Sequence, residues 1–286
     1  MKAVVTGGAG FVGSHLAQKL LDEKFEVVVV DDLSTGKESN IPQGVEFIED
    51  DISDIEMRDS IFESVDYIFH LAARNIVAST FDPNNDFETN VGGTFRLLQM
   101  ARENKNLKRF VYTSSASVYG NSKHLPVCED DGFDILSPYS ASKLCGEHYC
   151  VAFGQSYNIP YSIIRYSNVY GSRQGKEGVV GKFMRGEMFI HGDGEQTRDF
   201  TYVDDAVEAT YQIAMSPKGE GEAFNVGTGI ETSINRLAKM VHGKVEYIDR
   251  RDIDNIRRRC VNIDKIRKLI KWTPRFTLSE GLARMK

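Results

Sequence analysis

The sequence predicts an α/β fold in which a doubly wound parallel sheet is joined to a smaller, discontinuous C-terminal lobe. Short β-branched runs alternate with longer helical patterns over residues 1–170, and a glycine-rich turn follows the first run. The runs are apolar throughout, as in Val27-Val28-Val29-Val30. Such strands are typical of a parallel sheet that helices cover on both faces.

The elements of this fold can be assigned in chain order. Strands are expected near 2–6, 26–31, 45–49, 67–71, 109–114 and 161–166, and helices near 11–24, 54–64, 84–104 and 137–157. After residue 171 glycine and charge are mixed, a further strand is expected to end at 225–229, and a helix is expected at 234–242. We therefore expect one domain at 1–170 with about 198–230, and a second lobe at 171–197 with 231–286. Ligands of such folds bind at the carboxyl ends of the strands.

Composition excludes several classes of function. The chain has 286 residues, a net charge of -6 and a pI of about 5.6, which argues against a partner that is a nucleic acid or an anionic membrane. No apolar run approaches the ~20 residues that a membrane helix needs. The four cysteines form no CxxC pair, so we expect reduced thiols, no metal site and a cytoplasmic protein.

Three glycines join the first strand to the first helix. Gly7 allows a tight turn, Gly10 lets the backbone approach a phosphate, and Gly13 lets the helix pack on the strand. Asp31 and Asp32 close the second strand. A carboxylate there accepts the ribose hydroxyls of adenosine and repels a 2′-phosphate. The pattern predicts a Rossmann-like site for NAD rather than NADP, with Asp51 and Ile52 near the adenine.

A tyrosine and a lysine lie four residues apart in the expected helix at 137–157. This spacing puts Lys143 on the same face as Tyr139. A nearby ammonium favours the phenolate and lowers a pKa that starts near ~10, so Tyr139 is a candidate general base. Ser115 follows the fifth strand and can share the proton that Tyr139 moves.

These residues give the sequence its resemblance to the extended short-chain dehydrogenase/reductase family, specifically to its UDP-glucose 4-epimerase-like members (NAD-dependent epimerases and dehydratases). The resemblance covers nearly the whole chain. It rests on the Tyr139/Lys143 pair, on Ser115 and on the motifs Gly7/Gly10/Gly13, Asp31, Asp51-Ile52, Leu71-Ala72-Ala73, Asn90, 165–171, 192–200 and 225–227.

The resemblance implies an activity and a fuller set of site residues. Tyr139 would take the 4′-hydroxyl proton of a UDP-sugar while NAD, which stays bound, accepts the hydride; the 4-keto sugar then turns over and receives the hydride on its other face. Further cofactor contacts implied are Phe11, Val12, Ser34, Thr35, Gly36, Leu71, Ala72, Ala73, Asn90, Thr113 and Tyr166. Substrate contacts implied are Arg74, Asn75, Asn168, Arg198, Arg251 and Asp254, besides Ser115 and Tyr139.

The resemblance also implies a homodimer whose interface is built from the helices near 84–104 and 137–157. Dehydratase relatives carry Asp-Glu where this chain has Ser115-Ala116, and decarboxylating relatives carry Glu shortly before the residue that is Tyr119 here. Epimerisation of UDP-glucose and UDP-galactose at C4 is therefore the favoured function, with a 4,6-dehydratase as an alternative. Loss of Tyr139 or Lys143 would have favoured a non-catalytic sensor of NAD or a sugar nucleotide.

Three departures from the family pattern leave more than one sugar possible for the substrate. Arg74 and Asn75 stand where relatives often have a small, apolar or lysine residue, and Arg259 falls about where relatives have a gatekeeper of sugar size. Buried cations seek carboxylates, so UDP-glucuronate is an alternative substrate, as is UDP-N-acetylglucosamine. Segment 178–187 is about one helical turn short, which predicts a more open sugar side.

Overall fold

The computed structural model describes residues 1–54, 61–62, 64–175, 178–251 and 255–285. Within these residues, parallel strands form a seven-stranded sheet in the order β10-β6-β5-β4-β1-β2-β3. This confirms the predicted fold class and the six predicted strands. The seven strands of the sheet are β1 (Lys2–Thr6), β2 (Glu26–Asp31), β3 (Glu46–Glu49), β4 (Tyr67–His70), β5 (Arg109–Ser115), β6 (Tyr161–Tyr166) and β10 (Glu222–Val226).

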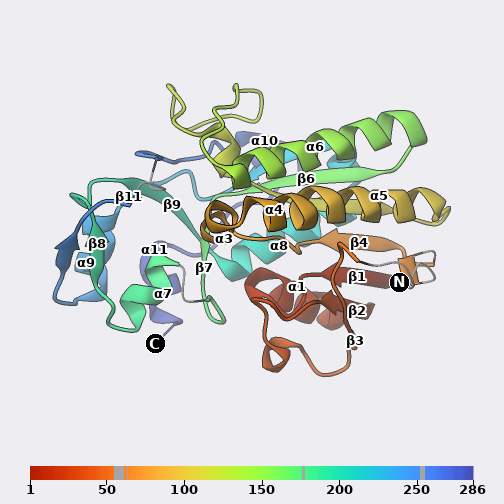
Figure 1. Cartoon of the computed structure of the whole chain (residues 1–286), viewed down its shortest axis with the longest axis horizontal. Helices are drawn as coiled ribbons and strands as arrows, with labels where there is room; N and C mark the ends of the chain where they lie inside the picture. The colour runs from red at the N-terminus through yellow and green to blue at the C-terminus, as the bar shows by residue number, and fades with distance from the viewer. Residues whose placement is uncertain (55–60, 63, 176–177, 252–254, 286) are drawn as a thin grey trace.

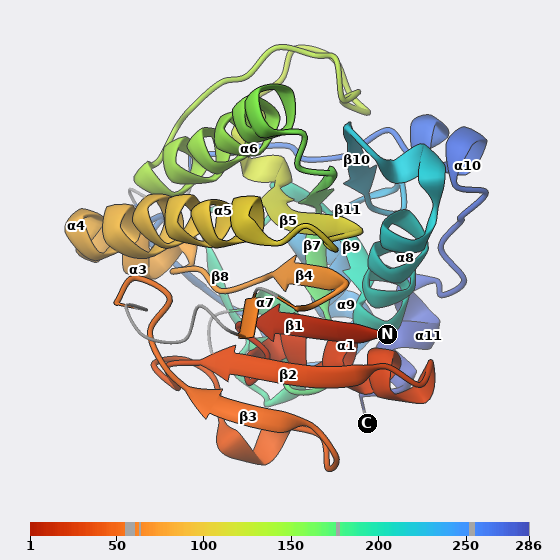
Figure 2. The same cartoon turned by 90° about the vertical axis from the view of Figure 1, so that its right-hand side faces the viewer.

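Helices cover both faces of this sheet. On one face lie α5 (Thr94–Glu103) and α6 (Pro138–Tyr157), and on the other α1 (Phe11–Asp22) and α8 (Val203–Met215) (Figures 1 and 2). The valines of β2 divide between the faces with the strand's period of two. Val27 and Val29 pack in the core under α1 and α8, whereas Val28 and Val30 pack under α5 and α6. Two buried faces explain why the strands are apolar throughout.

The helix expected at 84–104 is part of a longer helical run. It comprises α3 (Ile76–Phe81), α4 (Pro83–Asp86), a π-helical segment η2 (Phe87–Gly93) and α5. The segment η2 packs closely on the loop that follows β3. A Cβ on Gly93 would lie 2.6 Å from Cδ1 of Ile52 in that loop. Most of the helix expected at 54–64 lies outside the described residues. The helix at 137–157 is α6, which begins at Pro138.

Most of the remaining elements gather at one end of the molecule, on the left of Figure 1, whereas α10 (Asp264–Leu269) packs against β10 of the large sheet. A second sheet has the order β11-β9-β7, and β12 pairs with β8. The strands are β7 (Asn168–Tyr170), β8 (Phe189–His191), β9 (Thr197–Tyr202), β11 (Glu231–Ser233) and β12 (Glu246–Ile248). The helices are α7 (Val179–Met184), α9 (Ile234–Val241), α10 (Asp264–Leu269) and α11 (Leu278–Ala283). No helix of the described part is both long and apolar enough to cross a membrane.

The chain returns to the main sheet through α8 and β10 after β9. We therefore propose that the chain divides into a domain at 1–170 with about 198–230 and a second lobe at 171–197 with 231–286. Strand β9 pairs within the smaller sheet, and β10 pairs within the large one.

Candidate active site

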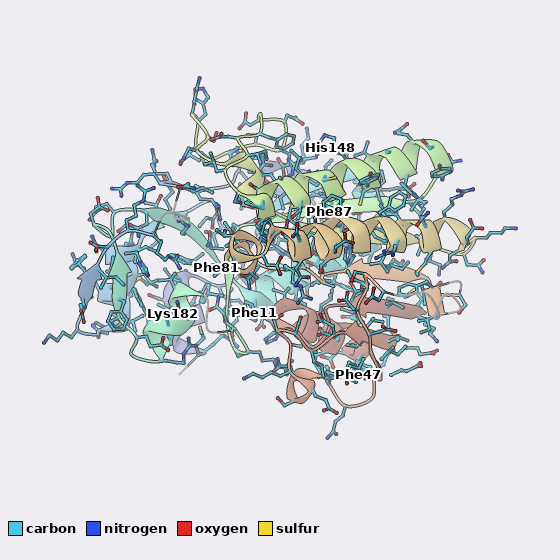
Figure 3. All side chains as sticks on the ribbon, in the orientation of Figure 1. Phe11, Phe47, Phe81, Phe87, His148 and Lys182 are labelled. Atoms are coloured by element: carbon cyan, nitrogen blue, oxygen red, sulfur yellow. The ribbon has the colours of Figure 1, made fainter. Side chains whose placement is uncertain are left out.

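A cavity of about 450 Å³ lies at the carboxyl ends of the sheet strands, where the loops after β1, β2, β3, β4, β5 and β6 meet. Phe11 stands at the start of α1, between the large sheet and the part of the molecule that carries Lys182 (Figure 3). The predicted site residues that line the cavity are Gly7, Gly10, Phe11, Val12, Gly13, Asp31, Asp32, Ser34, Thr35, Asp51, Ile52, Leu71, Ala72, Ala73, Arg74, Asn75, Thr113, Ser115, Tyr139, Lys143, Tyr166 and Asn168.

The glycine loop is too tight for side chains. Gly7 has a φ of +71°, and a Cβ there would lie 2.6 Å from the amide nitrogen of Ala72. A Cβ on Gly13 would lie 2.1 Å from the carbonyl oxygen of Gly7. Gly10 precedes α1 and supplies no side-chain cap, so the first amides of this 12-residue helix can bind an anion. The loop fits the diphosphate of a dinucleotide.

Asp31 fits the adenosine ribose of that dinucleotide. Its carboxylate accepts hydrogen bonds from the backbone N–H groups of Ala9 and Leu33, both at 2.9 Å. Burial raises its pKa, and those hydrogen bonds oppose the rise. Gly36 does not line the cavity but lies behind it, since a Cβ there would be 2.8 Å from Oδ1 of Asp31. The carboxylate is therefore fixed at the cavity wall, where it can accept hydroxyls.

Helix α6 positions Tyr139 and Lys143. Ser137 caps the helix in a capping box with Ser140, and Pro138 occupies the first turn, which fixes where the helix begins. Tyr139 is thus in the first turn, where the helix dipole favours an anion. Burial lowers the pKa of Lys143 to about 8, so the ammonium form is present at neutral pH.

The pKa of Tyr139 differs from the sequence expectation. Burial raises it, while a hydrogen bond with Ser115 and the charge of Arg259 lower it. The net direction is opposite to the expected lowering, because removal of the phenol from water outweighs the favourable interactions. Ser115 is held beside Tyr139 by β5, where it pairs with Tyr166 of β6 in the sheet.

Three buried polar atoms at the cavity wall lack hydrogen-bond partners within the described part of the chain. They are Oγ of Ser117, Oδ1 of Asn168 and Nε of Arg259. Buried polar atoms without partners are uncommon and costly. A polar ligand bound on this side of the cavity would supply partners for such atoms.

Arg259 ends a run of three arginines that point to different partners. Arg257 pairs with Asp193 at 2.7 Å, and Nε of Arg258 lies 3.0 Å from Glu231. Arg259 instead lines the cavity. Burial and the like charge of Arg198 lower its pKa to about 9. It therefore carries a positive charge at neutral pH next to Tyr139.

Two predicted substrate residues make other contacts. The guanidinium of Arg74 lies 3.0 Å from Asp32, on the predicted adenosine side. Oδ1 of Asn75 caps α3 by accepting from the N–H groups of Val77 and Ala78. Asn90 lies behind the cavity wall, where it accepts a 2.8 Å hydrogen bond from the N–H of Arg74.

Not all predicted residues reach the cavity. Arg198 and Arg251 are not among the described lining residues, and Arg198 donates to the carbonyl of Thr197 at 2.8 Å. Asp254 lies outside the described residues. The sequence analysis did not predict that Ser117 and Thr89 line the cavity. The spacing of Ser117 from Ser115 was a signal for Ser117, whereas the sequence holds no such signal for Thr89.

Comparison with known proteins identifies the family. A family model for the NAD dependent epimerase/dehydratase family matches residues 3–227. The UDP-glucose 4-epimerase of Mycolicibacterium smegmatis is 38% identical over 99% of this chain and 97% of its own. The UDP-glucose 4-epimerase of Thermotoga maritima, solved with UDP-glucose, superimposes with a TM-score of 0.94 at 36% identity, covering 100% of this chain and 97% of its own.

The UDP-glucuronic acid 4-epimerase of Bacillus cereus, solved with UDP-glucuronic acid and NAD, has a TM-score of 0.91 at 32% identity, covering 100% of this chain and 98% of its own. The glycine loop, Asp31 and the Tyr139/Lys143 pair thus occur in a chain that resembles such enzymes along its full length. This chain belongs to the NAD-dependent epimerase/dehydratase family.

Proposed function

We propose that the chain epimerises C4 of a UDP-sugar, with UDP-glucose and UDP-galactose as the substrate pair. The observation that carries the proposal is the placement of Ser115, Tyr139 and Lys143 in one cavity with the glycine loop and Asp31. The relatives named UDP-glucose 4-epimerase support the choice of sugar.

NAD, held by the glycine loop and Asp31, supplies a hydride acceptor and donor. The chain's own residues handle the proton and the geometry. Because burial raises the pKa of Tyr139, its phenol must first be ionised, and the hydrogen bond with Ser115 and the charge of Arg259 favour that ionised form. The phenolate then takes the proton from the 4′-hydroxyl, and Ser115 shares it. Lys143 keeps a positive charge near the reacting groups because its pKa of about 8 lies above neutral pH. The unpartnered atoms of Ser117 and Asn168 offer hydrogen bonds to the sugar nucleotide.

The test is a turnover screen of UDP-glucose, UDP-N-acetylglucosamine and UDP-glucuronate with free NADH monitored. We expect interconversion of C4 epimers without NADH release. Tyr139→Phe is expected to lose nearly all turnover and keep NAD. Tyr247→Phe, at an exposed tyrosine that does not line the cavity, is the matched control and should be fully active. A fully active Tyr139→Phe variant would refute the assigned base, and accumulation of a 4-keto-6-deoxy product would show a 4,6-dehydratase.

Arg259 supports a second candidate, UDP-glucuronate. Its buried Nε has no hydrogen-bond partner in the described part of the chain, and a carboxylate forms strong paired hydrogen bonds with a guanidinium. Arg259→Gln should then raise KM for UDP-glucuronate and spare UDP-glucose, while Arg258→Gln changes neither. An equal loss with all three sugars would assign Arg259 to the shared diphosphate instead.

We also propose that α5 and α6 form the interface of a homodimer. The two helices lie side by side on the outside of the sheet (Figures 1 and 2). Their neighbourhood exposes apolar side chains, namely Phe81, Phe87, Val151 and Tyr157. Sedimentation of wild type and Val151→Glu tests this, since a charge at a buried apolar contact should favour the monomer. A wild type that sediments as a monomer would contradict it.

A further inference from the structure

Arg74 contacts loops that are distant from it in the sequence. It follows β4, and its Nη2 atom lies 3.0 Å from Oδ2 of Asp32 and 3.9 Å from Oδ2 of Asp51. Its Nη1 atom donates to Oγ of Ser34. Asp32 and Ser34 follow β2, and Asp51 follows β3. One guanidinium thus connects the loops after β2 and β3 to the loop after β4.

The helical run holds the other side of the same guanidinium. Nε of Arg74 lies 3.2 Å from Oδ1 of Asn85 and 3.3 Å from Oγ1 of Thr89. The side chain of Asn90 holds the backbone of Arg74 through two hydrogen bonds. It accepts one from the N–H of Arg74 at 2.8 Å and donates the other to the carbonyl of Arg74 at 3.1 Å. Thr89 and Asn90 belong to the π-helical segment η2, and such segments often mark functional sites. The arginine is therefore held in place rather than free to swing in solvent.

The contacts lie at the adenosine end of the predicted NAD site. Asp32, Ser34, Asp51 and Arg74 all line the cavity, and Asp31, the predicted ribose ligand, directly precedes Asp32. Only 14% of the Arg74 side chain and 28% of the Asp32 side chain are exposed, so water screens this pair less than it screens a surface pair. The pair therefore joins the loops that flank the predicted adenosine end of the cavity.

We propose that Arg74, Asp32, Ser34 and Asp51 form a clasp that closes over the adenosine half of bound NAD and slows its release. The proposal rests on the proposed function, in which the chain reuses one NAD through many turnovers. The planar fork of arginine suits the role, because it reaches a carboxylate and a hydroxyl at the same time. Its positive charge also offsets the negative charges of Asp32 and Asp51, which would otherwise repel the diphosphate of the dinucleotide.

The clasp is tested by the rate of NAD release from the full chain. The protein is loaded with isotopically labelled NAD, excess unlabelled NAD is added, and the label that remains bound is followed with time. We expect Arg74→Gln to release NAD roughly tenfold faster, as for loss of one partner of a partly buried pair. Arg257→Gln, which breaks the exposed pair with Asp193, is the matched control and should release NAD at the wild-type rate.

A double-mutant cycle separates the clasp from direct contacts with NAD. If the pair acts as one unit, Asp32→Asn added to Arg74→Gln should accelerate release no further than Arg74→Gln alone. An unchanged release rate in Arg74→Gln, or fully additive effects of the two substitutions, would overturn the proposal. The assay contains no sugar, so a chain that turns over no UDP-sugar refutes the proposed function and leaves the clasp to be judged by release alone.

Discussion

Substitutions of the loop glycines should have separate effects on the stability of the fold and on the affinity for NAD. A Cβ at position 13 would lie 2.1 Å from the carbonyl oxygen of Gly7 and 2.9 Å from Cα of Gly8. Both neighbours are backbone, so the strain is relieved only if the turn moves. At Gly10 the nearest atom to the added Cβ is the same oxygen, at 3.0 Å, and a shift of a few tenths of an ångström relieves it.

These distances predict two different outcomes. Gly13→Ala should destabilise the fold by about 1–3 kcal/mol, the usual cost of overpacking, and should weaken NAD binding because the turn is displaced. Gly10→Ala should cost less than about 1 kcal/mol of stability. It should nevertheless weaken NAD binding strongly, since its methyl group occupies the space through which the backbone approaches the diphosphate.

Thermal unfolding without NAD and calorimetric titration with NAD measure the two effects. Gly132→Ala is the matched control, because no described heavy atom lies within 4 Å of the Cβ it adds. It should alter neither property. The reasoning would be refuted by a Gly13→Ala variant with wild-type stability, or by a Gly10→Ala variant that binds NAD as tightly as wild type.

Two further predictions concern buried charges. Glu147 accepts hydrogen bonds from Arg165 at 2.7–3.2 Å, so Glu147→Gln should lower the free energy of unfolding by about 3–5 kcal/mol in urea titrations; the exposed Asp193→Asn should change it little. The pKa of Lys143 is about 8 in the folded chain, whereas the ordinary pKa of a lysine is 10.5. Between those values the unfolded chain binds more protons, so wild-type stability should rise with pH relative to Lys143→Met; parallel profiles from pH 8 to 10 would contradict this.

Local sequence signals were sufficient for the central sheet and for much of the site. The strands β1 and β2, for example, are predictable because their apolar residues are buried on both faces of the sheet. The glycine loop and the Tyr139/Lys143 pair are also local, since the spacing of residues within one turn or helix determines their geometry.

Contacts between distant loops could not be predicted in the same way. The sequence suggested that Arg74 binds the sugar, yet its partners come from the loops after β2 and β3 and from η2, which only the fold brings together. Likewise, the raised pKa of Tyr139 depends on its removal from water in the assembled fold. The helix α8 carries a local pattern at Val203–Met215 that the sequence reading did not use.

The most direct test of the account is to follow hydrogen at C4 of the sugar. The purified chain, with no NAD added, is incubated with its UDP-sugar in D2O, and the product is examined by NMR. If hydride leaves C4 and returns to it within one closed site while Tyr139 exchanges only the hydroxyl proton, the epimer will carry protium at C4. Deuterium at C4 would contradict the account, because it would show that the C4 hydrogen had exchanged with solvent.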